Sequence, residues 1–279
     1  MTVDTYRSYR EWATTKLATR PQVSVVIPAY NEEIRILPTV GAIATHMSSR
    51  GEPWELIVAD DGSSDTTVAL LSGLRFPNMR VLTTDRNGGK GSAVRRGIAA
   101  ASGEYILFAD ADQSTPIEQF DHMFTRMREE GLDLLVGSRA AHGARVSGKS
   151  ILRRVLSRGL RTFVRVLFDI RVRDTQCGFK LFRAETAREI FARQVIDGFS
   201  FDLEIIYLCH RLGFKVDEIP VEWIDAPGSK VDEAKVVARF LVDLAHIRLN
   251  DLRGRYEPRP TVSASVPAPR SRTHGPDDL

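Results

Sequence analysis

Short apolar runs alternate with longer amphipathic stretches through the first half of the chain. The apolar runs predict strands, which lie at 23–28, 54–60, 79–84, 105–110 and 132–139. The stretches between them have apolar residues at helical spacing and predict helices at 31–49, 63–74, 89–101 and 116–130. Ser63 is a good N-cap, and Pro116 suits a first helical turn. The alternation predicts an α/β fold, with a mostly parallel central sheet flanked by helices on both faces.

The second half of the chain has a less regular pattern. It predicts amphipathic helices at 150–168, 201–212 and 231–252, and strands at 175–182 and 214–223. Pro220 has no backbone N–H and places the last strand near a sheet edge. The end of the chain is rich in Pro, Ser and Arg and predicts disorder. We expect an N-terminal extension at 1–21, a folded domain at 22–256 and a disordered tail at 257–279.

Polar clusters follow four of the predicted strands. They are Tyr30-Asn31-Glu32, Asp60-Asp61-Gly62-Ser63, Asp110-Ala111-Asp112-Gln113 and Ser138-Arg139. In open α/β sheets, ligands bind beyond the carboxyl ends of the strands. The clusters therefore predict one ligand site on one rim of the sheet.

Asp110 and Asp112 are spaced so that both carboxylates can face one divalent cation. Carboxylates prefer hard ions such as Mg²⁺ or Mn²⁺, and such an ion shares its remaining positions with a diphosphate. The alternative is an Asx-type turn that caps the helix predicted at Pro116. The position after a buried strand, on a rim with two other acidic clusters, favours the metal site.

The neighbouring clusters fit either nucleotide binding or local turn chemistry. Tyr30 could pack on a nucleobase and Glu32 could accept from ribose hydroxyls, whereas Asn31 could cap a helix. The run from Asp60 to Ser63 is equally good turn chemistry. These two pairs of alternatives stay open from spacing alone.

A glycine-rich stretch at 87–92 lacks the Walker spacing. Lys90 lies there at a predicted helix N-terminus, so it either approaches a phosphate or belongs to a flexible turn. No G-x-G-x-x-G follows the first predicted strand, which argues against a Rossmann dehydrogenase.

Charge is distributed unevenly along the chain. The 279 residues have a net charge of +3, but residues 139–173 carry ten Lys and Arg and one Asp. That segment is therefore at +9 and the remainder at −6. A basic segment on an otherwise acidic protein predicts an anionic partner.

The predicted helix 150–168 has an apolar face beside arginines at 154, 158, 161 and 165. It either lies in an anionic membrane interface or packs on the sheet as an ordinary surface helix. A second candidate membrane contact is the stripe of Val237, Phe240, Leu241, Leu244 and Ile247. The N-terminus lacks the apolar core of a signal peptide, and no apolar run is long enough to span a bilayer. We expect a soluble or peripheral protein in a reducing compartment, because its two cysteines form no disulfide framework.

Several motifs together resemble the family 2 glycosyltransferases, which have the GT-A nucleotide-sugar-binding fold. These are "VSVVIPAYNEE", "VADDGSSD", "RNGGKGSAVRRGI", "FADADQSTP" and "VGSR", in the family's order and spacing. The later motifs "DTQCGFKLF", "VEWIDAPGSKV" and "FLVDLAHIRLN" resemble the polyprenyl-phosphate glycosyltransferases, and most closely the dolichyl-phosphate glucosyltransferase branch. The resemblance covers about 22–256, which it identifies as the catalytic domain.

The resemblance implies roles for particular residues. Nucleotide binding falls to Pro28, Ala29, Tyr30, Glu32, Asp60, Asp61, Lys90, Asp110 and Ala111, and the metal site to Asp110, Asp112 and Gln113. Catalytic roles fall to Asp112, Arg139, Asp174, Gln176 and Lys230, and contact with the acceptor phosphate to Arg139, Ser229 and Lys230.

The activity that the resemblance implies is inverting transfer of a hexose onto a polyprenyl phosphate, with Mg²⁺ or Mn²⁺ as cofactor. The mannosyl enzymes usually have an arginine where this chain has Asp225, Ala226 and Pro227, which favours UDP-glucose over GDP-mannose as donor. A GDP-mannose-dependent enzyme, a family member with a non-lipid acceptor, and a non-catalytic nucleotide-sugar-binding module are the alternatives. We expect no nucleic-acid partner.

The eukaryotic glucosyl enzymes have an N-terminal membrane helix that this sequence lacks. Membrane contact would then come from the amphipathic helices. The expected location is the cytoplasmic face of the cell membrane, as a peripheral protein on an anionic surface.

Overall fold

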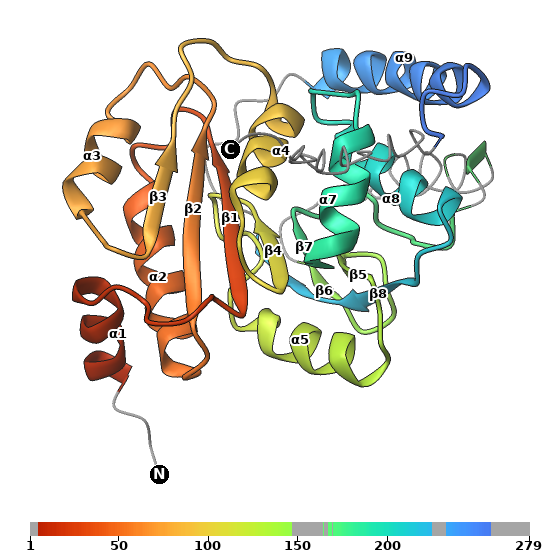
Figure 1. Cartoon of the computed structure of the whole chain (residues 1–279). Helices are drawn as coiled ribbons and strands as arrows, with labels where there is room; N and C mark the ends of the chain where they lie inside the picture. Colours follow the sequence, from red (N-terminus) through yellow and green to blue (C-terminus); the bar gives the residue numbers. More distant parts are fainter. Residues whose placement is uncertain (1–4, 147–163, 165–166, 169, 225–232, 258–279) are drawn as a thin grey trace, which may run out of the picture.

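A central sheet organises the protein. The computed structural model describes residues 5–146, 164, 167–168, 170–224 and 233–257. Within them, seven strands form one sheet in the order β3-β2-β1-β4-β7-β5-β8 (Figure 1). Their bounds are β1 Val23–Ala29, β2 Trp54–Asp60, β3 Met79–Leu82, β4 Tyr105–Ala109, β5 Leu134–Ser138, β7 Phe179–Arg183 and β8 Val216–Pro220. The short strands β6 Arg145–Val146 and β9 Glu222–Trp223 pair in parallel as a separate ladder.

Strand β7 is the antiparallel member of the large sheet. It lies between β4 and β5 and runs against both, while the other neighbouring pairs are parallel. Its first residue, Phe179, is opposite Ala109 at the end of β4. The segment just before β7 therefore reaches the same rim as Asp110. The predicted mostly parallel α/β sheet is confirmed.

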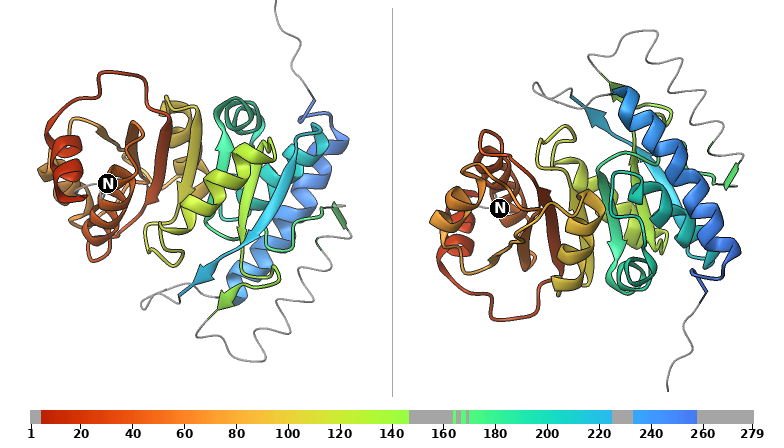
Figure 2. Two further views of the ribbon diagram at one scale, coloured as in Figure 1. Left: turned by 90° about the horizontal axis from the view of Figure 1, so that it is seen from below. Right: turned by 90° about the horizontal axis from the view of Figure 1, so that it is seen from above.

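Helices cover both faces of the sheet and create two hydrophobic cores (Figure 2). One core includes residues of α1 Thr5–Thr14, α2 Ile36–Ser49, α3 Thr67–Leu74 and α5 Gln119–Glu129. The other includes residues of α4 Lys90–Ala100, α7 Ala184–Arg193, α8 Phe201–Arg211 and α9 Glu233–Leu252. Burial on both faces explains why the central strands are mostly apolar, as the sequence of β2 and β4 indicated.

Three helices begin later than their sequence pattern predicted. The helix predicted from Asn31 begins at Ile36, the one from Ser63 begins at Thr67, and the one from Pro116 begins at Gln119. Asn31 has a φ of 56°, which an α-helix excludes, and its side-chain oxygen accepts from the Ser64 amide at 2.8 Å. The Glu33 carboxylate likewise accepts from the Thr66 hydroxyl at 2.7 Å. The two loops thus bond to each other rather than capping their own helices.

Two predicted strands are also shorter than expected. The strand predicted at 175–182 begins only at Phe179, and the preceding segment is a loop. The strand predicted at 214–223 divides into β8 and β9, and Pro220 ends β8 on the sheet edge, as its missing N–H requires.

The helical predictions for the C-terminal half are only partly described. The predicted helices at 201–212 and 231–252 correspond to α8 and α9. Leu244 and Ile247, placed in the predicted membrane stripe, are instead buried in the core at 3% and 0% exposure. Most of the basic helix 150–168 and the tail from 258 lie outside the described residues. No helix of the described ranges is long and apolar enough to cross a bilayer.

The N-terminal segment packs on the domain through Trp12. The Trp12 ring stacks on Trp54 at 4.2 Å between centroids, and its indole N–H donates to the Trp54 carbonyl at 3.0 Å. Asn78 holds the end of the segment by donating to the carbonyls of Trp12 and Thr15. The predicted boundary at residue 22 stays a prediction, but α1 shares the first core.

We expect Trp12→Ala to lower the free energy of unfolding by about 3 kcal/mol or more, because it empties a packed site and leaves the Trp54 ring exposed. Urea denaturation followed by circular dichroism measures the change. Glu11→Ala, one residue away on the exposed side of α1, is the control and should stay within about 0.5 kcal/mol of the wild type. Equal stability of the Trp12 variant and the wild type would show that α1 is a dispensable extension.

Candidate active site

A small cavity opens at the carboxyl ends of β4 and β5, beside the loop that precedes β7. It is lined by Asp110, Asp112, Ser114, Thr115, Arg139, Gln176, Gly178 and Trp223. Four of these, Asp110, Asp112, Arg139 and Gln176, are sequence-predicted site residues. The antiparallel β7 is what brings Gln176 to them, because it enters the sheet from this rim.

Asp110 is held from two sides. Its backbone N–H donates to the Gly178 carbonyl at 2.9 Å, and its carboxylate lies 2.6 Å from the Lys90 ammonium. A Cβ at position 178 would lie 1.9 Å from a carboxylate oxygen of Asp110. Glycine is therefore required at 178, because any side chain would displace that carboxylate.

The electrostatics around Asp110 show how closely the charges gather. Burial alone would lower the pKa of Lys90, but Asp110 and Asp202 attract its charge and the pKa lies above its ordinary value. The pKa of Glu32 is also raised, chiefly by burial; Arg35 opposes the rise, and the charges of Asp112 and Asp110 add to it. The carboxylates of Glu32, Asp110 and Asp112 are thus close enough to influence one another electrostatically.

Asp112 forms the Asx-type turn that the sequence offered as the alternative to a metal site. One carboxylate oxygen accepts from the Ser114 amide at 2.9 Å, which leaves the other oxygen for a cation. Gln113 has a φ of 51°, and its amide nitrogen lies 3.4 Å from the Thr39 hydroxyl. The turn and the cation site are compatible, because they use different oxygens of Asp112.

The donor set at this rim fits a hard divalent ion. Among the described residues, no group of three or more His, Cys, Asp or Glu side chains is placed to hold a metal. Two carboxylates, Asp110 and Asp112, face the cavity. Mg²⁺ is commonly bound by one or two carboxylates together with substrate phosphates, so the pair suffices once a diphosphate is present.

Arg139 and Asp174 form a buried bidentate ion pair. The Nε and Nη2 atoms of Arg139 donate to the two carboxylate oxygens at 2.7 and 2.9 Å, and the Arg139 amide donates at 3.0 Å. Burial opposes the charge of Asp174, but Arg139 outweighs it and lowers the pKa of this carboxyl to about 2. The guanidinium also lies 5.6 Å from the Trp223 ring centroid. Its orientation is therefore fixed at the cavity wall.

Gln176 presents an unused donor to the cavity. Its side-chain nitrogen is buried and has no hydrogen-bond partner among the described residues. A buried donor without a partner costs about 1 to 3 kcal/mol, which a ligand oxygen would recover. This is the polar atom that most directly indicates where a ligand binds.

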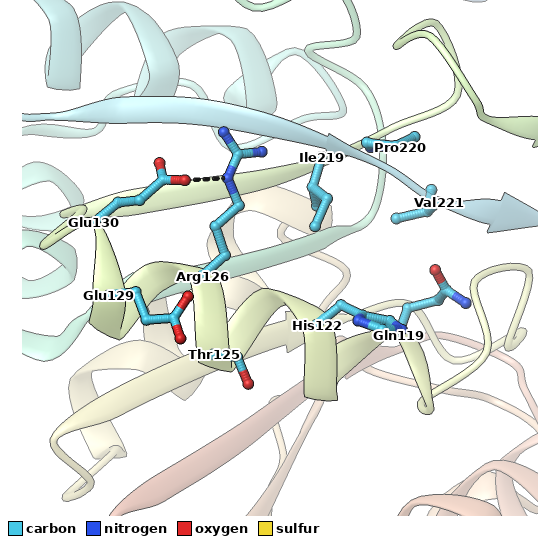
Figure 3. Close-up of a pocket in the computed structure, with 9 residues that line it drawn as sticks. All are labelled: Gln119, His122, Thr125, Arg126, Glu129, Glu130, Ile219, Pro220 and Val221. Carbon is cyan, nitrogen blue, oxygen red and sulfur yellow. Dashed lines mark hydrogen bonds and ion pairs between the residues drawn. The ribbon is translucent and has the colours of Figure 1, made fainter.

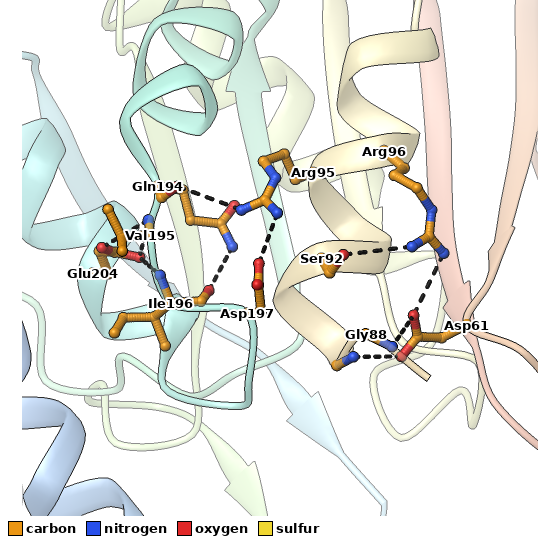
Figure 4. A network of polar contacts seen from close by, with 11 residues as sticks. Asp61, Gly88, Ser92, Arg95, Arg96, Gln194, Val195, Ile196, Asp197 and Glu204 are labelled. Carbon is orange, nitrogen blue, oxygen red and sulfur yellow. Dashed lines mark hydrogen bonds and ion pairs between the residues drawn. The ribbon is translucent and has the colours of Figure 1, made fainter. Parts of the chain in front are cut away.

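The predicted nucleotide-binding aspartates are engaged by the protein itself. Asp60 accepts from the amides of Gly62 and Ser63, at 3.0 and 3.1 Å. Asp61 accepts from the amides of Gly88 and Gly89, at 3.1 and 2.7 Å (Figure 4). They shape the loops at the ends of β2 and before α4. Turn chemistry, the alternative in the sequence, is therefore present at Asp60, whereas Asp61 holds a loop 27 residues further along the chain.

The other predicted nucleotide-binding residues surround the ends of β1 and β4. Pro28 and Ala29 are buried at the end of β1, beside Ala59 and Asp60 of β2. Ala111 is buried, whereas Tyr30 is 47% exposed and free to pack against a ligand. Ser229 and Lys230 lie outside the described residues.

Lys180 is a buried charge that the sequence analysis missed. It is fully buried on β7, where its ammonium donates to the Cys177 carbonyl at 2.6 Å and pairs with Asp202 at 2.5 Å. Burial raises the pKa of Asp202, against the opposing charges of Lys180 and Lys90. A lysine inside the apolar run "GFKLF" was the available signal, because such a charge requires a buried partner. Lys180 fixes the loop that carries Gly178.

A wider cavity lies away from this rim, between α5 and the edge strand β8 (Figure 3). Its lining residues are Gln119, His122, Thr125, Arg126, Glu129, Glu130, Ile219, Pro220 and Val221. Arg126 spans it and donates to Glu130 at 2.9 Å. None of the predicted site residues lines this cavity, so its size does not make it the catalytic centre.

The chain can be assigned to a known protein family. Residues 24–191 match glycosyl transferase family 2, and the chain belongs to this family. It is therefore a glycosyltransferase, as the motifs had indicated.

Curated relatives narrow the resemblance to one branch. The chain is 35% identical over 246 residues to a dolichyl-phosphate beta-glucosyltransferase of Dictyostelium discoideum, covering 83% of this chain and 75% of that one. It is 34% identical over 255 residues to the human protein of the same name, covering 84% and 77%. The predicted branch is confirmed.

Solved structures share the fold. A glucosyl-3-phosphoglycerate synthase from Mycobacterium tuberculosis, in complex with Mn²⁺ and uridine-diphosphate-glucose, superposes with a TM-score of 0.61 at 19% identity, over 88% of this chain and 82% of that one. A mannosyl-3-phosphoglycerate synthase from Rubrobacter xylanophilus gives 0.61 at 16% identity, over 91% and 80%. At such identities the likeness establishes the GT-A fold alone.

The Asp174 pair makes stability depend on pH. A carboxyl with a lowered folded-state pKa stabilises the protein above its ordinary pKa, and this contribution is lost as pH falls from about 4 towards about 2. We expect Asp174→Asn to cost about 2 kcal/mol or more at pH 7, and this cost to shrink below pH 4. Urea denaturation at pH 7, 4 and 3 measures it. The exposed Asp85→Asn is the control, and a cost for Asp174→Asn that is independent of pH would contradict the ion pair.

Proposed function

We propose that this glycosyltransferase moves glucose from UDP-glucose onto the phosphate of a dolichyl-type polyprenyl lipid, with inversion at the anomeric carbon. The observation that carries the proposal is the cavity in which Asp110 and Asp112 lie beside the fixed Arg139 guanidinium. The carboxylates suit a cation with a diphosphate, and the guanidinium suits a second phosphate. A site that combines both is matched to a phosphorylated donor and a phosphorylated acceptor.

The names of the curated relatives support the acceptor and the sugar. The relatives from Dictyostelium discoideum, Saccharomyces cerevisiae and Homo sapiens are dolichyl-phosphate beta-glucosyltransferases, at 34 to 35% identity. The choice of UDP-glucose also rests on Asp225, Ala226 and Pro227. The related mannosyl enzymes usually have an arginine at this place in the sequence.

The reaction requires no strong general base. A phosphate monoester has a second pKa of about 6, so the acceptor oxygen is largely ionised near pH 7. That oxygen attacks the anomeric carbon, a new carbon–oxygen bond forms, and the bond from this carbon to the diphosphate oxygen breaks to release UDP. The divalent ion, when bound by Asp110 and Asp112, stabilises the negative charge that develops on the leaving diphosphate.

The chain's own residues orient the two anions. Asp174 occupies the Nε and Nη2 atoms of Arg139, which leaves Nη1 for the acceptor phosphate. The unpaired amide nitrogen of Gln176 donates to an oxygen of the sugar or of the diphosphate. Tyr30 packs on the base, and Ser229 and Lys230 contact phosphate from the segment beyond β9.

Helix α9 supplies the membrane contact in this proposal. Its exposed apolar residues are Leu241, Val242, Leu249 and Leu252. At 3.6 residues per turn they fall within an arc of roughly 100°, opposite the buried Leu244 and Ile247. The exposed Arg253 and Arg255 follow at the end of the helix and suit anionic headgroups.

The same helix is tied to the catalytic rim. Asp243 of α9 accepts from the Ser200 hydroxyl at 2.6 Å, and the adjacent Phe199 ring lies 5.9 Å from the Lys90 ammonium. A lipid phosphate presented along α9 is thereby delivered to the end of the sheet that holds Asp110. We propose a peripheral protein on the cytoplasmic face of the membrane.

We expect UDP-glucose with Mn²⁺ or Mg²⁺ to raise the melting temperature of the protein, because a ligand that binds only the folded state stabilises it. Asp112→Asn should lower turnover with a short-chain polyprenyl phosphate by about a hundredfold or more, since it removes a ligand of the ion that stabilises the leaving diphosphate. Differential scanning fluorimetry and product chromatography provide the two readouts.

The control for this experiment is Asp85→Asn, which removes an exposed carboxylate away from the cavity and should leave turnover unchanged. Asp112→Asn should itself melt within a few degrees of wild type without ligand. Stabilisation and turnover with GDP-mannose alone would instead identify a mannosyltransferase. Full turnover of Asp112→Asn would refute the metal assignment.

We expect the double change Leu241→Glu and Leu249→Glu to abolish co-flotation with anionic liposomes while UDP-glucose binding persists. Each leucine contributes about 1.5 to 3 kcal/mol when fully removed from water, and a glutamate adds repulsion from the surface. Thr14→Glu with Ser72→Glu adds the same charge at exposed positions on α1 and α3 and serves as the control. Wild-type protein that never floats, even at low salt, would rule out α9 as a membrane contact.

A further inference from the structure

Lys90 lies where a cation is needed. Its ammonium is 2.6 Å from the Asp110 carboxylate, one of the two carboxylates assigned above to the divalent ion. The family resemblance assigns Lys90 and Asp110 to nucleotide binding but gives no role to the ion pair between them. An ammonium and a metal ion compete for the same carboxylate oxygen, because each needs the negative charge that the other neutralises.

The backbone of Lys90 is anchored, so only its side chain can leave Asp110. The two residues before it donate their amides to Asp61, at 3.1 and 2.7 Å. Gly89 has a φ of 98°, and a Cβ there would lie 2.4 Å from the Asp197 carbonyl oxygen. The start of α4 is thus fixed against the loop before α8.

The Lys90 side chain lies between two aromatic rings. Its ammonium is 5.4 Å from the centroid of Phe108, which is buried, and 5.9 Å from that of Phe199, which is 55% exposed. Such cation–π contacts tolerate movement of the ammonium across the ring face. Because Phe199 is exposed, the ammonium is near solvent on that side, and we infer that it can move from Asp110 towards the proposed diphosphate site.

We propose that Lys90 is an internal counter-ion that occupies the cation position beside Asp110 and transfers to the donor diphosphate when the metal binds. The inference rests on the proposed function. Without ligands, Lys90 offsets the repulsion between Asp110 and Asp112. With both ligands, Asp110 holds the metal and Lys90 holds phosphate, so each ligand makes room for the other. Metal and nucleotide binding are therefore coupled, and by linkage the coupling is reciprocal.

The test measures binding of Mn²⁺ by the electron paramagnetic resonance signal of the free ion, with and without UDP. Lys90→Met keeps the length of the side chain and removes its charge. We expect Mn²⁺ alone to bind this variant about fivefold or more tightly than wild type, because its competitor is gone. The enhancement of Mn²⁺ binding by UDP should fall correspondingly. Lys90→Arg retains a competing cation and should resemble wild type.

A matched control separates the direct contact from general charge effects. Arg35→Met removes a cation that pairs with Glu32 at 2.7 Å on the same rim. With screening at physiological salt, it should leave the affinity for Mn²⁺ alone within about twofold of wild type. Melting curves establish that each variant is folded.

The outcomes separate the two proposals. Wild type that binds Mn²⁺ with UDP, together with a Lys90→Met variant that binds Mn²⁺ alone no more tightly than wild type, would refute the counter-ion role and leave the proposed function standing. Wild type that binds neither Mn²⁺ nor UDP at millimolar concentrations would refute the proposed function and this inference with it.

Discussion

Repulsion between Asp110 and Asp112 is the constraint on which the rest of the site depends. Two carboxylates directly after a buried strand are unfavourable unless positive charge compensates them. Lys90 supplies that charge from the start of α4, at 2.6 Å from Asp110. Asp61 fixes the chain before Lys90, and Gly178 leaves room for the Asp110 carboxylate. The loops at the ends of three separate strands are thus arranged around one pair of acids.

The reversed strand β7 extends this arrangement to Arg139. Because β7 enters the sheet at the rim, the loop before it carries Gln176 to the cavity and Asp174 to the guanidinium of Arg139. The ion pair of Lys180 and Asp202, which is buried in the protein interior, fixes that loop. A buried ion pair adds little net stability, since desolvation offsets its attraction. Its effect here is positional, because Lys180 holds the Cys177 carbonyl, and the next residue, Gly178, accepts from the Asp110 amide.

Local patterns were sufficient for the first parallel strands but not for the polar loops or for the strands of the second half. The run "WELIVAD" predicted β2 to the residue, because a strand buried on both faces is mostly apolar. The helix starts near Asn31 and Ser63 were wrong because those loops bond to each other across more than thirty residues. The stacking of Trp12 on Trp54 and the pairing of Lys180 with Asp202 are likewise contacts between distant residues, which periodicity cannot reveal. That Asp110, Asp112 and Arg139 lie together was predictable, because the carboxyl ends of the strands meet at one edge of an α/β sheet.

An ionised acceptor changes what the active site has to provide. If the nucleophile needs no base, the remaining barrier includes the repulsion between the acceptor phosphate and the diphosphate on the donor sugar. Arg139 is suited to reducing this repulsion. Asp174 fixes the plane of its guanidinium through Nε and Nη2, and Nη1 stays available for a phosphate. In the function proposed above, Lys90 serves the donor side in the same way. The rim therefore places the cations Lys90 and Arg139 against the carboxylates of Asp110 and Asp174, so that charges of both signs are compensated before any ligand binds.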